Sequence, residues 1–177
     1  SYAASTIERI DYSNDTATGV EKGPLSASRT YFSATSNTSF GYFAGGSYLN
    51  TTADESIVDR IDYSNDTATA LVKGPLSSDK IGFGAVGNQS FGYFGGGYVS
   101  YSTVDRIDYS NDTATALVRG PLDRSDNRLG GSGNSDFGYL VGGDVKSKVS
   151  RIDYSNDTAT ASPKGPLATA RQFAQGT

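Results

Sequence analysis

Ten residues in the order Arg-Ile-Asp-Tyr-Ser-Asn-Asp-Thr-Ala-Thr occur four times in this chain of 177 residues, beginning at Arg9, Arg60, Arg106 and Arg151. An identity of this length, repeated within so short a chain, indicates a tandem array of one structural unit. Four identical segments are more easily explained as parts of a scaffold than as four active sites.

The spacing around the decapeptide shows which part of the unit is constant. Each copy is followed by Gly-Pro-Leu, whose Gly lies 14 residues after the Arg. The first three Gly-Pro-Leu segments are followed by Phe-Gly-Tyr, whose Phe lies 17 residues after that Gly. The Arg-to-Arg distance nevertheless changes from 51 to 46 to 45 residues, and all of this variation lies between Phe-Gly-Tyr and the next Arg. One variable segment in a constant unit is typical of a stacked repeat whose insertions collect on one face.

Within a unit, the residue pattern predicts four short antiparallel strands. Residues 102–109 alternate, with Val104, Arg106 and Asp108 on one face and Ile107 and Tyr109 on the other. Ser-Asn-Asp then supplies turn residues, and residues 113–118 are predicted to return as a paired strand. Residues 81–86 and 91–94 are predicted as the other two strands, the latter ending in glycines. No segment has a sustained helical period.

These features resemble the kelch motif. Residues 91–96 resemble its hydrophobic strand and glycine pair, residues 104–109 its third strand, residues 110–113 its turn, and residues 120–122 its Pro-Leu linker; Arg29 and Arg171 follow that linker as Arg often does in the family. The resemblance implies an all-β fold, a kelch-type β-propeller of four-stranded antiparallel blades. The outer-strand Trp of the family is missing. The wording of the repeat is also similar to tandem repeats of marine phage structural (tail or fibre) proteins.

In this register, residues 1–177 form one repeat array with three complete blades and parts of another. The predicted boundaries are a partial blade at 1–23, blades at about 26–73, 77–119 and 123–164, and the start of a next blade at 165–177. Because the chain begins with Ser and contains no Met, we expect a processed chain or a fragment of a longer array. Assembly of several copies into a ring, or a four-bladed ring that lacks one strand, are the alternatives.

Composition argues against most catalytic chemistry. The chain has no Cys, His, Met or Trp, which removes thiol nucleophiles, zinc–thiolate sites and the usual general base. We therefore expect no enzyme, no cofactor and no metal. The net charge of −4 is interspersed and no apolar run reaches 18 residues, so neither nucleic acid binding nor membrane insertion is expected.

Two repeated features have both a functional and a structural interpretation. Asp62, Asn65 and Asp66 resemble the start of a calcium loop, but the loop lacks the central Gly and the distant Glu, which favours a hairpin turn. The Arg and first Asp of the decapeptide share a strand face and could bind an anion, but a repeated Arg–carboxylate pair that links neighbouring strands or blades is favoured. The residues of these predicted structural pairs are Arg9, Asp11, Arg60, Asp62, Arg106, Asp108, Arg151 and Asp153.

The variable segments and the Gly-Pro-Leu linkers are predicted to lie on one face of the array, opposite the Ser-Asn-Asp turns. Residues of this face that could bind a ligand or partner are Tyr48, Asn50, Tyr98, Tyr101 and Lys146, with Asp79, Lys80 and Arg124 beside them. Tyr and Asn on loops above a rigid scaffold suit partner or glycan recognition.

These observations predict a non-enzymatic structural or adhesive protein, a phage virion tail or fibre component for host-surface attachment. Its partners would be other virion or array subunits and a host-surface glycan or protein, with a homo-oligomer possible. The alternative is a glycan-binding lectin module of a secreted or cell-surface protein.

Overall fold

The computed structural model describes residues 4–48, 54–98 and 101–172, and its architecture is all-β. Three four-stranded antiparallel sheets follow one another, and within each the strand order follows the chain. The first sheet contains β4 (Ser33–Ser36), β5 (Phe40–Ala44), β7 (Val58–Asp62) and β8 (Leu71–Lys73). The second contains β9 (Gly84–Gly87), β10 (Phe91–Gly95), β11 (Val104–Asp108) and β12 (Leu117–Arg119). The third contains β13 (Leu129–Gly133), β14 (Phe137–Gly142), β15 (Val149–Asp153) and β16 (Ser162–Lys164).

Two smaller strand pairs accompany these sheets. β1 (Ile7–Arg9) and β2 (Val20–Lys22) form a hairpin in the sequence register of the third and fourth strands of a unit, and we call residues 7–22 the first hairpin. β3 (Arg29–Thr30) pairs with β6 (Ser47–Tyr48). The helical elements of the described residues are three 3₁₀ turns, η1 (Tyr63–Asn65), η2 (Tyr109–Asn111) and η3 (Tyr154–Asn156). The described part of the chain contains no helix with the length and apolarity to cross a membrane.

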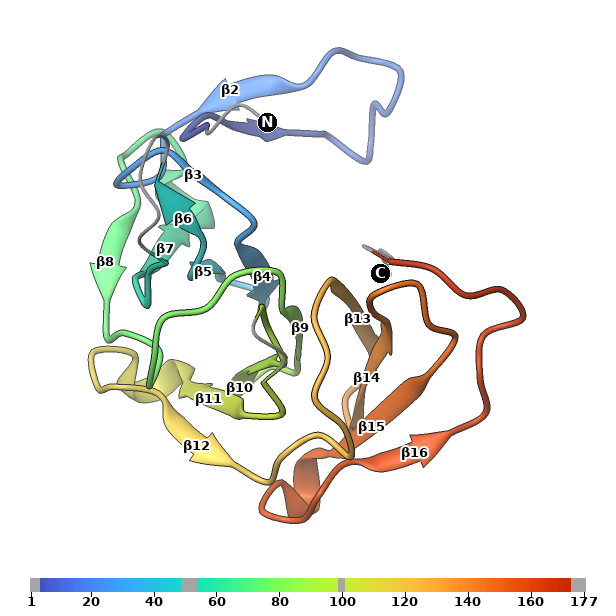
Figure 1. The fold of residues 1–177 in the computed structure, drawn as a ribbon. Coiled ribbons are helices and arrows are strands. Elements are labelled where there is room, and N and C mark those ends of the chain that lie inside the picture. The colour runs from blue at the N-terminus through green and yellow to red at the C-terminus, as the bar shows by residue number, and fades with distance from the viewer. Residues whose placement is uncertain (1–3, 49–53, 99–100, 173–177) are drawn as a thin grey trace.

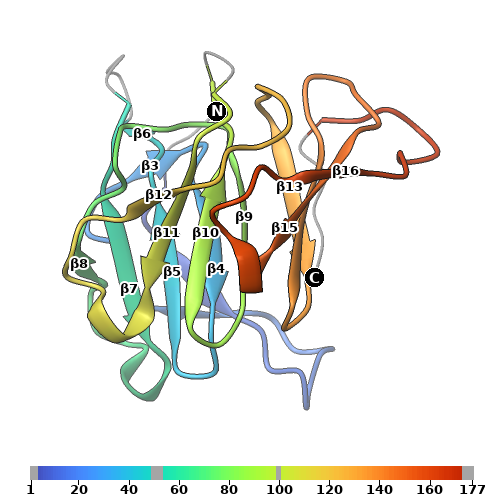
Figure 2. The same ribbon diagram turned by 90° about the horizontal axis from the view of Figure 1, so that it is seen from below.

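The sheets lie side by side around a common centre, with β4, β9 and β13 innermost and β8, β12 and β16 outermost (Figure 1). The inner strands contact one another, β9 against both β4 and β13. The described parts of the variable segments lie toward one end of the assembly, and the 3₁₀ turns of the Ser-Asn-Asp segments lie toward the other (Figure 2). The expectation of an all-β chain built from four-stranded antiparallel sheets is confirmed.

Strand boundaries differ from the sequence prediction where the sheets meet. β12 begins at Leu117, whereas a strand was expected from residue 113. The reason is that Ala116 donates its backbone N–H to the Pro75 carbonyl of the preceding sheet at 2.8 Å, so this segment bonds across to its neighbour. β9 begins at Gly84, because Gly82 has a positive φ of 62° that interrupts an extended strand.

Each sheet is buried on both faces near its centre. In β11, Val104, Asp105 and Ile107 are all buried, so alternation along this strand does not separate a core face from a solvent face. Between the first and second sheets, the rings of Tyr42 and Tyr109 stack with centroids 4.5 Å apart. Stacked tyrosines of this kind, repeated by Tyr93 and Tyr154 between the second and third sheets, pack neighbouring sheets against one another.

Candidate functional site

The second Asp of the repeated decapeptide connects each sheet to the one before it. Asp112, which follows η2 in the second sheet, accepts a hydrogen bond from Nη1 of Arg60 at 2.8 Å and lies 3.3 Å from Nζ of Lys73. The hydroxyl of Tyr42 donates to the same carboxylate at 3.0 Å. Three donors from the first sheet thus converge on one carboxylate of the second, a charge-assisted arrangement.

The same arrangement recurs at the neighbouring boundaries, and we call this set of contacts a joint. Asp157 of the third sheet accepts from Arg106 at 2.7 Å and from the Tyr93 hydroxyl at 2.9 Å. Asp66 of the first sheet accepts from Arg9 of the first hairpin at 2.7 Å. The residues of the repeated decapeptide therefore bind adjacent units to one another, the Arg of one copy to the second Asp of the next.

The first Asp of the decapeptide has a different, local role, so the structure does not bring the predicted Arg–Asp pairs together. Oδ1 of Asp62 accepts hydrogen bonds from the backbone N–H and the hydroxyl of Ser64, at 2.9 Å and 2.6 Å. These bonds hold the pKa of the Asp62 carboxyl below its usual value. Asp11, Asp108 and Asp153 make the same bonds. Arg60 and Asp62 lie two residues apart on one strand but have different partners. The Asp62 carboxylate bonds within its own turn, whereas Arg60 bonds to Asp112 of the next unit.

Backbone contacts complete each joint and explain the constant Gly-Pro. The N–H of Gly74 donates to the carbonyl of Asp112 at 2.8 Å, and Gly23 and Gly120 make the equivalent bonds. A Cβ at Gly74 would lie 2.0 Å from the carbonyl oxygen of Ala114. Only Gly allows the two backbones this close.

The acidic side chains of the turn after β7 are held by other groups of the chain. Asp62 is bonded to Ser64, while Asp66 meets Arg9 and Lys22 of the first hairpin. Within residues 4–48, 54–98 and 101–172, no three acidic, His or Cys side chains are grouped as metal ligands.

The buried tyrosines of the joints predict a loss of stability in alkali. Burial raises the pKa of Tyr109 to about 12, and burial also raises the pKa values of Tyr42 and Tyr93. Because the folded-state pKa lies above the unfolded value of 10.0, stability is fully present below pH 10.0 and is lost as pH rises toward about 12. For Tyr109 alone, the shift from 10.0 to about 12 corresponds to about 3 kcal/mol.

Denaturant unfolding across this pH range checks the expectation. Burial lowers the pKa of Lys80, so the contribution of Lys80 makes stability rise with pH up to the unfolded lysine pKa of 10.5, which opposes the tyrosine effect. Tyr109→Phe should therefore flatten the alkaline decline above that value. An alkaline decline that is equally steep in this variant would contradict the assignment.

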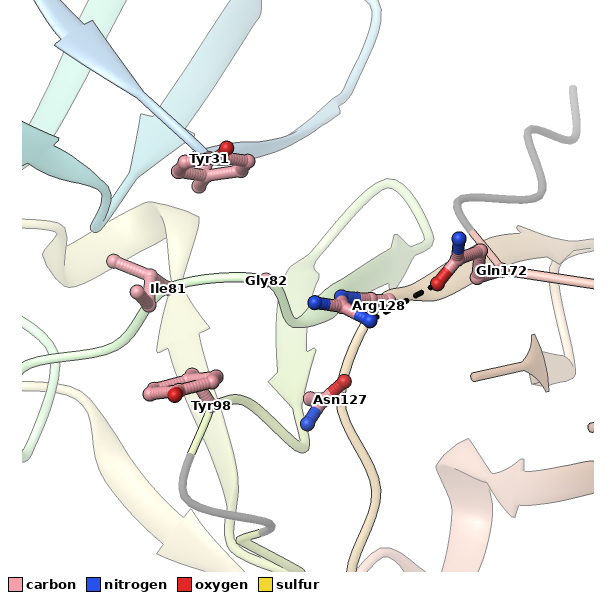
Figure 3. Close-up of a pocket in the computed structure, with 7 residues that line it drawn as sticks. All are labelled: Tyr31, Ile81, Gly82, Tyr98, Asn127, Arg128 and Gln172. Atoms are coloured by element: carbon pink, nitrogen blue, oxygen red, sulfur yellow. Dashed lines mark hydrogen bonds between the residues drawn. The ribbon is translucent and has the colours of Figure 1, made fainter. Parts of the chain in front are cut away.

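Residues from successive units line a pocket of about 360 Å³. It is lined by Tyr31, Ile81, Gly82, Tyr98, Asn127, Arg128 and Gln172 (Figure 3). Tyr31, Gly82 and Arg128 occupy one equivalent position in three successive units, eight residues after the Gly of Gly-Pro-Leu. All three have a positive φ, of 58°, 62° and 56°. The backbone is thus repeated around the pocket, whereas the side chains differ.

Backbone hydrogen bonds connect these three positions. The N–H of Gly82 donates to the carbonyl of Tyr31 at 3.1 Å, and the N–H of Arg128 donates to the carbonyl of Gly82 at 2.5 Å. A positive φ is strained for Tyr and Arg but not for Gly. Strain of this kind is concentrated at functional sites, where it sets the direction of a side chain.

The side chains give the pocket aromatic walls and a polar end. Tyr31 and Tyr98 lie on opposite sides of it, with Ile81 between them at one end and Arg128 and Gln172 toward the other (Figure 3). Tyr31 is 50% exposed and Tyr98 54% exposed. Nη1 of Arg128 donates to Oε1 of Gln172 at 3.1 Å, which fixes the guanidinium beside the pocket. Aromatic walls with a few polar groups are typical of small-ligand sites.

Of the loop residues predicted to bind that the structure describes, Tyr98 alone lines this pocket. Tyr101 is 42% exposed, and its N–H bonds the Gly97 carbonyl next to Tyr98. Tyr48 is half-buried in β6, and Lys146 lies 3.2 Å from the buried carboxylate of Asp126, so both have structural contacts. Asn50 lies outside the described residues.

The three charged residues expected beside them divide between surface and interior. Lys80 is fully buried, 3.1 Å from Asp105, and Arg124 lies 2.9 Å from Asp126. These two side chains are not available on the face, whereas Asp79 is exposed. The inward direction of Lys80 and Arg124 follows from the buried carboxylates, which require a cation.

Sequence reasoning missed Tyr31, Asn127, Arg128 and Gln172. The signal that could have found the site is a difference between equivalent positions of the repeat. Tyr31, Gly82 and Arg128 are equivalent, so their different side chains are not required by the fold of the unit.

No protein-family model matches this chain, and none of the curated proteins is significantly similar to it.

Proposed function

We propose that this chain is a non-enzymatic structural and adhesive module, a kelch-type β-propeller array that binds a surface glycan in the pocket between Tyr31 and Tyr98. The observation that carries the proposal is the contrast between joints and pocket. The joints repeat the same residues, whereas the pocket places different side chains on one repeated backbone position. Identical residues in every unit suit contacts that hold a scaffold together. A single binding site requires side chains that differ from one unit to the next.

The chemistry of the pocket suits a carbohydrate. The apolar C–H faces of a sugar ring pack on aromatic rings, which Tyr31 and Tyr98 supply on two sides. The hydroxyl groups of a sugar are recognised by planar amide and guanidinium groups, which Asn127, Arg128 and Gln172 supply. The pocket volume of about 360 Å³ falls in the range of about 300–1,000 Å³ found for ligand sites.

We place this module in a phage virion, as a tail or fibre component that attaches to a host surface. The resemblance of the repeated decapeptide sequence to tandem repeats of marine phage structural proteins favours this location. A glycan-binding lectin module of a secreted or cell-surface protein is the second candidate, and the same pocket favours it. Detection of the chain at symmetric positions in purified virions would support the first, whereas a monomer with catalytic turnover would contradict both.

A glycan array followed by calorimetry tests the binding proposal. Tyr98→Ala should weaken binding of any glycan found by the array at least about tenfold, since stacked aromatic contacts contribute about 1 kcal/mol beyond their buried area. Tyr31→Gly should weaken it similarly without unfolding the chain, because Gly is the native residue at the equivalent position 82 with a φ of 62°.

Tyr12→Ala is the matched control, because Tyr12 is 93% exposed and lies in the first hairpin, away from the pocket lining. It should leave glycan affinity unchanged. The proposal fails if the array, including acidic glycans, contains no ligand for the native chain, or if Tyr98→Ala and Tyr31→Gly bind as the native chain does.

A further inference from the structure

The third sheet carries one half of a joint. Arg151 and Lys164 occupy the positions of Arg60 and Lys73, which clamp Asp112 at the joint between the first and second sheets. The Arg151 guanidinium lies over the Phe137 ring, 4.2 Å from its centroid, and no carboxylate of the described residues lies within ion-pair distance of it. Lys164 is exposed and likewise has no ion pair among the described residues.

The backbone and aromatic parts of this half-joint are open as well. A Cβ at Gly23, Gly74 or Gly120 would lie 1.8–2.0 Å from a carbonyl oxygen of the next unit, whereas one at Gly165 meets nothing within 4 Å. Tyr42 and Tyr93 are fully buried beneath the stacked tyrosine of the next sheet, whereas Tyr139 at the equivalent position is only partly buried. We call Tyr139, Arg151, Lys164, Gly165 and Pro166 the open face.

The first hairpin carries the complementary half. Asp15 occupies the position of Asp66, Asp112 and Asp157, yet its carboxylate has no hydrogen bond or ion pair among the described residues. Tyr12, equivalent to Tyr109 and Tyr154, is 93% exposed.

We propose that the open face binds the first hairpin of a second copy of this chain, head to tail, by forming a fourth joint of the same kind. Asp15 of that copy accepts from Arg151 and Lys164, and its Tyr12 stacks on Tyr139. The N–H of Gly165 donates to the Asp15 carbonyl, and the N–H of Gly19 donates to the carbonyl of Pro166.

Charge and shape both favour this occupant. The open face offers two cations, and the hairpin offers one unpaired carboxylate at the matching position. Within the structure, the Arg–Asp and Gly contacts that each side lacks are made three times, and the tyrosine stack is made twice. A contact between unlike surfaces on two copies is heterologous, so it extends into a chain or closes into a ring.

Sedimentation of the unsubstituted 177-residue chain over about 10 µM to about 1 mM tests the proposal, because one joint is a small interface and is expected to be weak. The average mass should rise with concentration. Asp15→Ala should weaken association about 30-fold or more, since truncating one partner of a buried charged contact has an effect of this size. Gly165→Ala should block it too, because the Cβ would occupy the space of the incoming carbonyl.

A mixture separates docking from general stickiness. Each variant is defective on one side only, so Asp15→Ala and Gly165→Ala should be monomeric alone and form a one-to-one complex when mixed. Glu21→Gln, an exposed charge change on the same hairpin, should associate like the native chain. The proposal is overturned if the native chain stays monomeric throughout, if either variant associates normally, or if the mixture remains monomeric. Neither Asp15 nor Gly165 lines the glycan pocket, so the outcome of the sedimentation experiment is independent of glycan binding.

Discussion

Replacing Gly74 with Ala is expected to lower the free energy of unfolding by about 3 kcal/mol, although a single methyl group is added. The added Cβ would lie 2.0 Å from the carbonyl oxygen of Ala114, well inside van der Waals contact. The Ala114 oxygen is a backbone atom, so no side-chain rotation can relieve the clash. The hydrogen bond from the Gly74 N–H to the Asp112 carbonyl also holds the two backbones close together. Gly74 is not among the glycines with positive φ, so the loss comes from the joint and not from backbone strain.

Gly165→Ala is the matched control, since it makes the same change at the equivalent position of the open face. Nothing lies within 4 Å of a Cβ there, so a change within about 0.5 kcal/mol is expected. Urea unfolding at a chain concentration too low for association measures both variants. Because stability in a repeat array depends on contacts between neighbouring units, Gly74→Ala should also broaden the transition. Equal stability of the two variants would show that the joints do not hold the sheets together.

Asp105→Ala is expected to lower the free energy of unfolding by about 3–5 kcal/mol, because it leaves a buried cation without its partner. Nζ of Lys80 lies 3.1 Å from the Asp105 carboxylate, and both side chains are fully buried. The residual partner of Lys80 is the Thr103 carbonyl at 3.1 Å, which is neutral. Burial lowers the pKa of Lys80, and the Asp105 charge opposes that effect.

The pH dependence of this variant distinguishes a stranded charge from simple loss of packing. Without Asp105, the folded-state pKa of Lys80 falls further below the unfolded value of 10.5. The unfolded chain then binds more protons in this interval, so the stability of Asp105→Ala should rise with pH up to that value. Guanidinium unfolding at several pH values measures the slope.

Two further variants complete the test. Lys80→Met combined with Asp105→Leu should recover most of the loss, since a buried ion pair replaced by apolar groups is often near neutral. Glu21→Ala removes an exposed acidic group and should change stability by less than about 0.5 kcal/mol. If the double variant is as unstable as Asp105→Ala, shape at this position matters more than charge.

The third sheet shows that the chain itself varies this pair. Asp126 occupies the position of Lys80, and Ser150 that of Asp105. Arg124 approaches from the linker, 2.9 Å from Asp126, and donates to the Ser150 hydroxyl at 2.9 Å. An anion replaces the cation of Lys80 and a neutral Ser replaces Asp105, while Arg124 supplies the cation, so a cation and an anion are still buried together, as burial of either alone would be costly.

The repeat predicted the all-β architecture well because its information is local. Turn residues such as Asn65 and strand residues such as Val104 act through their immediate neighbours, and constant spacing ties them into one unit. The residues that line the candidate pocket were predicted less well. Tyr98 was found because it is a loop aromatic, whereas Tyr31 and Arg128 were missed because they lie 97 residues apart and meet only around the centre.

By itself, the sequence determined the number of units, their antiparallel strands and the loop in which they differ, since each depends on residues close together in the chain. Tertiary structure decided the partners of the charged groups that join one sheet to the next. It directed Arg60 to Asp112 of the next sheet rather than to Asp62, and it placed Lys80 inside. The physical reason is that an Asp two residues from an Arg is better satisfied by nearby N–H and hydroxyl groups, whereas the long Arg side chain reaches a neighbour that sequence distance does not reveal.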